Sequence, residues 1–137
     1  MSTVYSEITL KNANDVGNHE RGLIKEEDIR SETVTALVDT GSMSMVITEE
    51  LREKLGLSIK GERTVLIANG QRVHCKVTEP VDIDWKNRSS SQRAVIIPGA
   101  EKVLLGAIPL EDMDLMVNPV TQEVVGVHGD VVETMVL

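Results

Sequence analysis

Short runs in which apolar and polar residues alternate recur along the chain and predict β-strands. Alternation with a period of two places successive side chains on opposite faces of a strand, so that one face can be buried. Two such runs flank Asn69-Gly70, and Asn-Gly between alternating runs is a strong hairpin signal. The predicted strands are residues 3–10, 33–38, 63–67, 72–77, 81–85 and 93–98, with an apolar run at 103–105 and a closing strand or hairpin at 120–127.

Two segments have the pattern of short helices. Thr48 is of an N-cap residue type and two acids follow it. Leu51 and Leu55 lie four residues apart, and Gly56 ends the segment. A second short helix is predicted at 109–116, with Pro at its start and acids in its first turns. The remaining segments are interpreted as turn-rich at 12–18, as a charged loop or short helical turn at 22–32, and as a polar turn at 86–92.

These elements predict a mainly β fold with one or two short helices, built as a small closed sheet. The length of 137 residues suits a single domain that covers 1–137. Its core is expected at 33–127, with an N-terminal strand at 3–10 and a C-terminal strand or tail at 124–137.

The composition predicts an aliphatic core and an acidic surface. The chain has no Phe, one Tyr and one Trp, so Val, Ile and Leu must fill the interior. The formal net charge is −8 and no local cluster of Lys or Arg is present. Both features argue against a nucleic-acid partner, because binding to phosphates needs a basic surface.

The metal-binding residue types are sparse. Cys75 is the only cysteine, which excludes an intramolecular disulfide and a thiolate cluster. His19, His74 and His128 lack the spacing of metal ligands, so we expect no metal and no cofactor. The N-terminal residues do not resemble a secretory signal, and no apolar run approaches the roughly 18 residues of a membrane span. A cytoplasmic protein without a membrane partner is therefore expected.

The strongest chemical signal is Asp39-Thr40-Gly41-Ser42. It follows the strand at 33–38, so a hydrophobic strand delivers a carboxylate into a tight turn. Thr40 can hydrogen-bond locally and across an interface, Gly41 permits close backbone approach, and Ser42 can donate to the carboxylate. The tripeptide Asp-Thr-Gly alone favours an ordinary Asx-turn at a strand end, so the surrounding elements must decide.

The order of those elements favours the catalytic interpretation. After Asp39 come a hairpin around Gly70, an apolar-apolar-Gly element at 104–106 and a short helix. From residue 33 to residue 127 the chain resembles the retroviral-type, retropepsin-like aspartic proteases, and it is most similar to their small prokaryotic single-domain relatives. This resemblance implies a closed acid-protease-type β-barrel that hydrolyses peptide bonds.

The resemblance also implies roles for individual residues. Asp39 would be the acid/base carboxylate, and Thr40 would lock the two turns of a dimer together. Gly41 and Ser42 would orient the carboxylates. The flap that closes over the substrate would be formed by Ile67, Ala68, Asn69 and Gly70. The loop behind the turn would contain Leu105 and Gly106.

Two segments depart from the retroviral pattern. Family members usually carry an acid shortly after the catalytic turn and an Arg after the apolar-apolar-Gly loop, and these side chains form ion pairs near the dimer interface. Here residues 43–45 are Met-Ser-Met and residues 107–109 are Ala-Ile-Pro, so the dimer contacts must differ. The flap tip is Ala-Asn-Gly rather than a pair of glycines.

A single Asp-Thr-Gly predicts a homodimer. The reaction needs two carboxylates that share one proton, because like charges about 3 Å apart do not both ionise; aspartic proteases are the familiar example. A two-fold dimer supplies the second Asp39 by symmetry. The expected partners are a second copy of the chain and a polypeptide substrate, with segments 4–10 and 124–136 as strands that pair in the dimer.

Two other interpretations remain open. The first is a catalytically silent binding or dimerisation module of the same fold, because fold does not determine function. The second is an unrelated closed β structure with a chance tripeptide, which the absence of a hairpin over Asp39 would favour. The acids that we interpret as structural or solvated are Asp82, Asp84, Asp112, Asp114 and Asp130.

Overall fold

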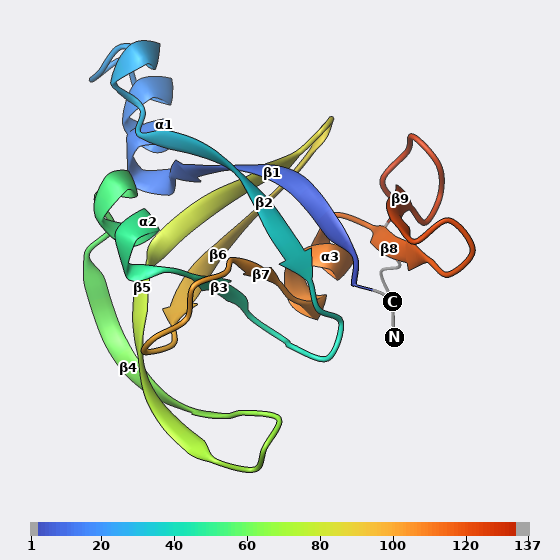
Figure 1. Cartoon of the computed structure of the whole chain (residues 1–137). Helices are drawn as coiled ribbons and strands as arrows, with labels where there is room; N and C mark the ends of the chain where they lie inside the picture. The colour runs from blue at the N-terminus through green and yellow to red at the C-terminus, as the bar shows by residue number, and fades with distance from the viewer. Residues whose placement is uncertain (1–2, 134–137) are drawn as a thin grey trace, which may run out of the picture.

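Residues 3–133 are described by the structure, a computed structural model, and they form a seven-stranded sheet and a two-stranded hairpin (Figure 1). The strands are β1 (Tyr5–Asn12), β2 (Ser31–Val38), β3 (Met45–Ile47), β4 (Ile59–Leu66), β5 (Arg72–Trp85), β6 (Arg88–Ile96), β7 (Leu104–Leu105), β8 (Leu115–Asn118) and β9 (Glu123–Gly126). The helical elements are α1 (Ala13–Glu20), the 3-10 turn η1 (Glu26–Asp28), α2 (Glu49–Leu55) and α3 (Ala107–Asp112). The prediction of a mainly β fold with short helices is confirmed.

The large sheet closes on itself through β1. Its strand order is β1-β2-β7-β3-β6-β5-β4, and β1 pairs with β5 as well as with β2. The second half of β5 pairs with β1, while its first half pairs with β4. The predicted closed sheet is therefore present, and the β4–β5 hairpin projects from it (Figure 1). The second edge of β1 pairs with β5 only from Thr9 to Asn12, so the pairing of segment 4–10 across a dimer stays a prediction.

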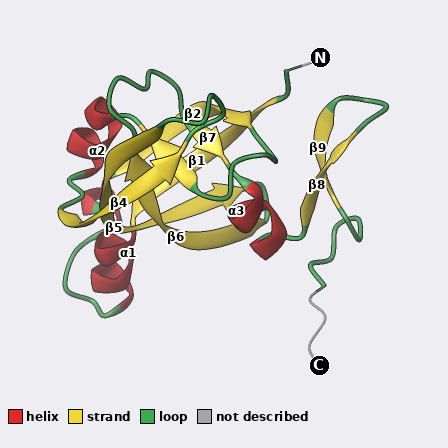
Figure 2. Ribbon diagram, turned by 90° about the horizontal axis from the view of Figure 1, so that it is seen from below, coloured by secondary structure: helices red, strands yellow, loops and turns green. Residues whose placement is uncertain are grey.

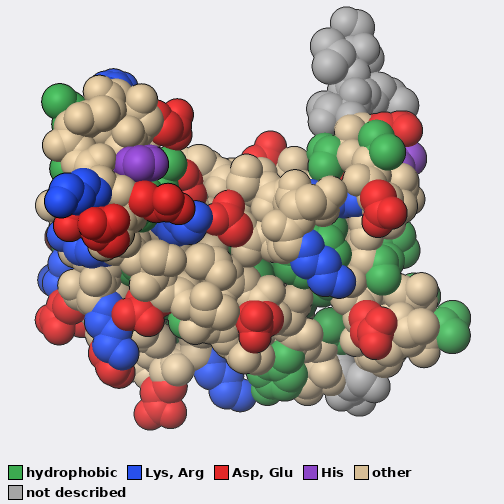
Figure 3. All heavy atoms as spheres, turned by 90° about the horizontal axis from the view of Figure 1, so that it is seen from above, with side chains coloured by type: hydrophobic (Ala, Val, Ile, Leu, Met, Phe, Trp, Pro, Cys, Tyr) green, Lys and Arg blue, Asp and Glu red, His purple; other side chains and the backbone are tan. Residues whose placement is uncertain are grey.

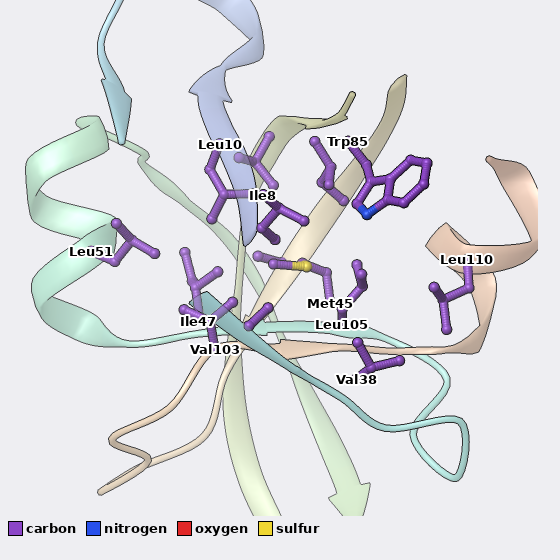
Figure 4. Packing of buried hydrophobic residues seen from close by; sticks show 14 of the residues in the cluster. Ile8, Leu10, Val38, Met45, Ile47, Leu51, Trp85, Val103, Leu105 and Leu110 are labelled. Carbon is purple, nitrogen blue, oxygen red and sulfur yellow. The ribbon is translucent and has the colours of Figure 1, made fainter. Parts of the chain in front are cut away.

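The interior of the closed sheet is aliphatic, as the composition predicts. Buried side chains from several strands meet there (Figure 4), and they include Ile8, Val38, Met45, Ile47 and Leu105. Trp85 lies at the edge of this core, where its Nε1 donates to Ser6 Oγ at 2.9 Å. Each fully buried aliphatic side chain stabilises the fold by about 1.5–3 kcal/mol before entropy is counted. This packing fixes β2 and β7, the strands that carry the candidate site.

Helix α2 is formed as its sequence predicts. Thr48 Oγ1 accepts a hydrogen bond from Leu51 N at 3.1 Å, which satisfies a free amide of the first turn. Gly56 adopts a left-handed conformation with φ of 65° and ends the helix. Leu51 and Leu55 are buried against the core. Helices α1 and α2 lie at one end of the sheet and the β8–β9 hairpin lies at the other (Figure 2).

The interpretation of residues 12–18 as turn-rich is wrong, because α1 spans Ala13–Glu20. The buried Asn12 caps this helix by accepting from Asp15 N at 3.1 Å, and it donates to Leu55 O at 2.9 Å. Asp15 also holds Arg30 through two side-chain contacts of 2.8 and 2.9 Å. That ion pair, with Arg30 hydrogen-bonded to the carboxylate, lowers the pKa of Asp15.

Acidic and basic side chains lie interspersed on the face of the molecule that Figure 3 shows.

The interpretation of residues 86–92 as a polar turn is also wrong. Strand β6 begins at Arg88, so the turn consists of Lys86 and Asn87. Arg88 is only 5% exposed, and its guanidinium donates to Met113 O at 3.0 Å and to Asp114 O at 2.7 Å. It also donates to Gly129 O. A buried Arg therefore ties the C-terminal part of the chain to the sheet.

The C-terminal elements differ in extent from the prediction. Helix α3 is Ala107–Asp112 rather than 109–116, because Asp114 has a positive φ of 55° and β8 follows it. Strand β9 pairs with β8 in an antiparallel hairpin and ends at Gly126. Of the C-terminal strand or tail predicted at 124–137, residues 124–126 belong to β9 and residues 127–133 form no strand. Residues 134–137 lie outside the described part. None of the helices among the described residues is long and apolar enough to span a membrane.

Candidate active site

The end of β2 delivers Asp39 to the site. Strand β2 runs parallel to β7, with Leu37 opposite Leu104 and Val38 opposite Leu105. The ladder continues into the turn, because Asp39 N donates to Leu105 O at 3.0 Å. The backbone of Asp39 is therefore fixed by the sheet, while its side chain is only partly buried.

The turn that follows is held by its own hydrogen bonds. Ser42 N donates to Asp39 O at 3.1 Å, and Gly41 N donates to Asp39 Oδ1 at 3.0 Å. One carboxylate oxygen of Asp39 is thus oriented by a backbone amide. Ser42 Oγ donates to Ser44 O at 3.4 Å, so the prediction that Ser42 donates to the carboxylate is wrong in the single chain. Thr40 is exposed at the outer side of the turn.

Gly106 lies directly behind the turn. A Cβ atom at this position would lie 2.3 Å from Ser44 O and 2.7 Å from Ser42 O, so only glycine allows this approach. This close approach allows the next two backbone amides to form hydrogen bonds to the turn. Ala107 N donates to Ser42 O at 2.7 Å, and Ile108 N donates to Met43 O at 3.1 Å. Leu105 is fully buried in the core. The loop predicted behind the turn therefore supports the backbone that carries Asp39.

The hairpin of β4 and β5 forms the other wall of the site. Its tip is closed by Gly70 N donating to Ile67 O at 2.9 Å and Ile67 N donating to Gln71 O at 3.0 Å. Gly70 has a φ of 85°, a conformation that favours glycine. Asn69 Oδ1 accepts from Gln71 N at 2.9 Å, which stiffens the tip. The Asn-Gly signal thus correctly predicted a hairpin.

A cleft of about 680 Å³ separates the hairpin from the Asp39 turn. It is lined by Asp39, Gly41, Ser42, Met43, Ser44, Val46, Arg63, Thr64, Val65, Leu66, Ile67, Ala68, Val95, Ile97, Leu104 and Ile108. The structure thus brings five predicted site residues to one cleft: Asp39, Gly41, Ser42, Ile67 and Ala68. Of the other predicted site residues, the exposed Thr40, Asn69 and Gly70 and the buried Leu105 and Gly106 do not line it.

Sequence reasoning missed the part of the hairpin that precedes the predicted flap. Residues 63–66 of β4 line the cleft together with Ile67, whereas the flap was predicted to begin at Ile67. The strand predicted at 63–67 could therefore have extended the predicted binding surface.

The remaining acids and the cysteine have other surroundings. Asp84 pairs with Lys11 at 3.2 Å, and burial raises the pKa of Asp82. Asp114 Oδ2 accepts a hydrogen bond from His128 Nδ1 at 2.7 Å, so this acid holds the C-terminal loop in place and does not lie at a helix start. Cys75 is buried, as predicted, and burial raises its pKa. Within residues 3–133 no group of three His, Cys, Asp or Glu side chains could hold a metal ion.

Residues 26–129 match the family model described as aspartyl protease, which covers most of the chain and includes the Asp39 turn, the hairpin and Gly106. The chain belongs to the aspartyl protease family. Among solved structures, the EIAV protease in complex with the inhibitor HBY-793 matches with 20% identity and a TM-score of 0.56, over 81% of this chain and 88% of that chain. This likeness shows a retropepsin-type fold.

A retropepsin-like aspartic protease from Rickettsia conorii also matches, with 21% identity and a TM-score of 0.47, over 85% of this chain and 88% of that chain. A comparison with curated protein sequences gives no significant match.

In this member of the aspartyl protease family, the two segments that depart from the retroviral pattern, residues 43–45 and 107–109, lie side by side. Ile108 N is bonded to Met43 O, and the two side chains are 42% and 68% exposed. An apolar pair therefore stands where retroviral members usually carry an acid and an Arg. This surface is open in the single chain.

Proposed function

We propose that the protein is an aspartic endopeptidase that is active as a homodimer, with Asp39 of each chain forming the catalytic pair. The observation that carries this proposal is the cleft itself. Asp39 is the only acid among its lining residues, and it stands on a turn that backbone contacts hold rigidly. A reaction that needs two carboxylates must therefore take the second from another chain.

Two-fold symmetry provides that second carboxylate. A dimer axis that passes next to the turn would bring two identical Asp39 side chains together. The exposed Thr40 and Met43 lie on the turn and can contact the partner there. Two carboxylates that share one site retain one proton between them, and the pair then titrates as a unit.

The chemistry follows from that shared proton. The ionised carboxylate takes a proton from a water molecule, whose oxygen adds to the scissile carbonyl carbon. The protonated carboxylate donates its proton to the carbonyl oxygen, which gives a neutral tetrahedral diol. The first carboxylate then gives the proton that it took from water to the amide nitrogen, and the C–N bond breaks. One hydroxyl of the diol returns its proton to the second carboxylate, so that a carboxylic acid and an amine are released and the shared proton is restored. The hydrogen bond from Gly41 N keeps one Asp39 oxygen in place through these steps.

The hairpin and the cleft support a polypeptide substrate. The cleft is mostly apolar, and its two walls are the Asp39 turn and the hairpin. An extended peptide that lies between them would have its carbonyl groups directed toward the carboxylates and its side chains in apolar pockets. The role of the hairpin as a closing flap is part of this proposal.

Peptide cleavage tests the proposal. A peptide library is incubated with the wild type, with Asp39→Asn and with Asp130→Asn, at acidic to neutral pH, after sizing of the protein. Asp130 is exposed and does not line the cleft, so its variant controls for loss of an acid. We expect cleavage by the wild type and the control, but not by Asp39→Asn. A confirmed dimer that cleaves no peptide would favour the silent binding module instead.

A further inference from the structure

Arg63 is an unusual residue in the cleft. Among the lining residues it is the only one with a charge besides Asp39. It comes from the middle of β4, away from the tip of the hairpin. In a chain with a net charge of −8, a cation that faces a mostly apolar cleft requires an explanation.

The register of the hairpin shows which face Arg63 occupies. Arg63 lies opposite Cys75, and Val65 lies opposite Val73. Residues directly opposite each other in an antiparallel pair share a face. Arg63 therefore lies on the same face of the hairpin as the buried Cys75 and as Val65 and Ile67 of the cleft, and its own side chain is exposed.

The acid next to Arg63 in the sequence has a partner of its own. Glu62 contacts His74 with an Oε2–Nε2 distance of 3.2 Å. Neither of these two residues lines the cleft. Among residues 3–133, no carboxylate pairs with Arg63 and no hydrogen bond of its guanidinium is found. An adjacent acid is thus used elsewhere, and the cation in the cleft remains free to bind a ligand.

We propose that Arg63 selects substrates with an acidic side chain at an outer position, and this inference rests on the proposed protease function. A guanidinium and a carboxylate form a bidentate, charge-assisted hydrogen bond, which a neutral or basic side chain does not provide. The apolar lining between Arg63 and Asp39 would bind the residues next to the scissile bond.

The spacing along the hairpin sets the position of the acid. Arg63 lies four residues before Ile67 along the hairpin, and a strand advances by about 3.3 Å per residue. An extended peptide under the flap advances at the same rate, so the acidic side chain belongs about three or four residues from the scissile bond. A homodimer holds two Arg63 side chains, one toward each end of the substrate. Either end, or both ends, can therefore carry the acid.

The test uses decapeptides with an apolar central pair and with Glu, Gln or Lys at the third and fourth residues from the centre. Cleavage rates are measured for the wild type, for Arg63→Glu and for Arg72→Glu. Arg72 is an exposed cation at the start of β5 in the same hairpin and does not line the cleft, so it is the matched control. We expect the wild type and Arg72→Glu to cleave the Glu peptides about three- to tenfold faster than the Gln peptides. Arg63→Glu should instead prefer the Lys peptides.

Binding of the same peptides to Asp39→Asn, followed by fluorescence anisotropy, separates this inference from the proposed function. If peptides are cleaved but Glu, Gln and Lys are equivalent, the role of Arg63 is refuted and the protease function stands. A second outcome is that no peptide is cleaved, that Glu peptides bind to Asp39→Asn more tightly than Gln peptides, and that this difference disappears when Arg63→Glu is added. In that case the binding role of Arg63 stands and the protease function is refuted. Absence of both cleavage and charge-dependent binding refutes both.

Discussion

Replacement of Gly106 by Ala tests the contact that supports the catalytic turn. The new Cβ would lie 2.3 Å from Ser44 O, 2.7 Å from Ser42 O and 2.8 Å from Met43 C. All three atoms belong to the backbone, so no side chain can rotate away. The backbone φ of Gly106 is −88°, a value that Ala adopts freely, so the effect comes from crowding alone.

The magnitude follows from the contacts that must change. Overpacking of a tight site costs about 1–3 kcal/mol. Separation of the two loops also weakens the bonds from Ala107 N to Ser42 O and from Ile108 N to Met43 O, each worth about 1 kcal/mol. We expect the free energy of unfolding to fall by about 3–5 kcal/mol, a large part of the usual 5–15 kcal/mol of a domain.

The assay is urea unfolding at one fixed protein concentration, because dimer formation makes apparent stability depend on concentration. Gly61→Ala is the matched control, since a Cβ there meets nothing within 4 Å and the residue does not have a positive φ. The control should unfold within about 0.5 kcal/mol of the wild type. If Gly106→Ala is as stable as Gly61→Ala, the account of the supporting loop is refuted.

Three further predictions concern parts of the fold around the site. Arg88→Met removes hydrogen bonds to three backbone carbonyls and should lower the free energy of unfolding by about 3 kcal/mol in urea, whereas Lys60→Met at an exposed position of β4 should not. Thr48→Ala removes the cap of α2 and should lower it by about 1 kcal/mol; retention of the wild-type midpoint would contradict the capping role. His128→Gln should remove a pH dependence of stability, measured as the thermal unfolding midpoint across pH. An unchanged dependence of the midpoint on pH would contradict the stabilising role of the hydrogen bond between His128 and Asp114.

The direction of that pH dependence follows from the pKa shifts. The hydrogen bond to Asp114 raises the pKa of His128 above its ordinary value of 6.5, so this contribution is complete below 6.5 and is lost as pH rises through the higher folded value. The amide of Glu133 and then His128 lower the pKa of Asp114 from 3.8, so its contribution is present above 3.8 and is lost as pH falls through the lower folded value. The pair therefore stabilises the fold most between these limits.

The parts of the site that the sequence predicts are those encoded by local pattern. A run of strand formers before Asp39 placed the carboxylate at a strand end, and Asn69-Gly70 placed a hairpin tip. Gly106 was predicted behind the turn by family resemblance alone. Its physical reason, the approach to Ser42 O and Ser44 O, depends on two segments far apart in the chain and needed the structure.

The parts that the sequence did not predict depend on distant partners. Helix α1 lacks a clear apolar stripe, and it is held by the Asn12 cap and by the pair of Asp15 with Arg30. Arg88 lies in a polar stretch that is typical of a surface turn, but the carbonyls that it binds come from the turn between α3 and β8 and from the C-terminal loop. No local pattern identifies such acceptors, because tertiary contacts override local preference.

The central claim is that each active site contains Asp39 from two chains. It is tested most directly by refolding the wild type with an equal amount of Asp39→Asn, so that subunits pair at random, and measuring cleavage of a peptide that the wild type cleaves. Random pairing leaves about one quarter of the dimers with two wild-type chains, so we predict about one quarter of the activity of the same total amount of wild type. Activity of about one half would show that each wild-type chain acts alone, and it would contradict the shared pair.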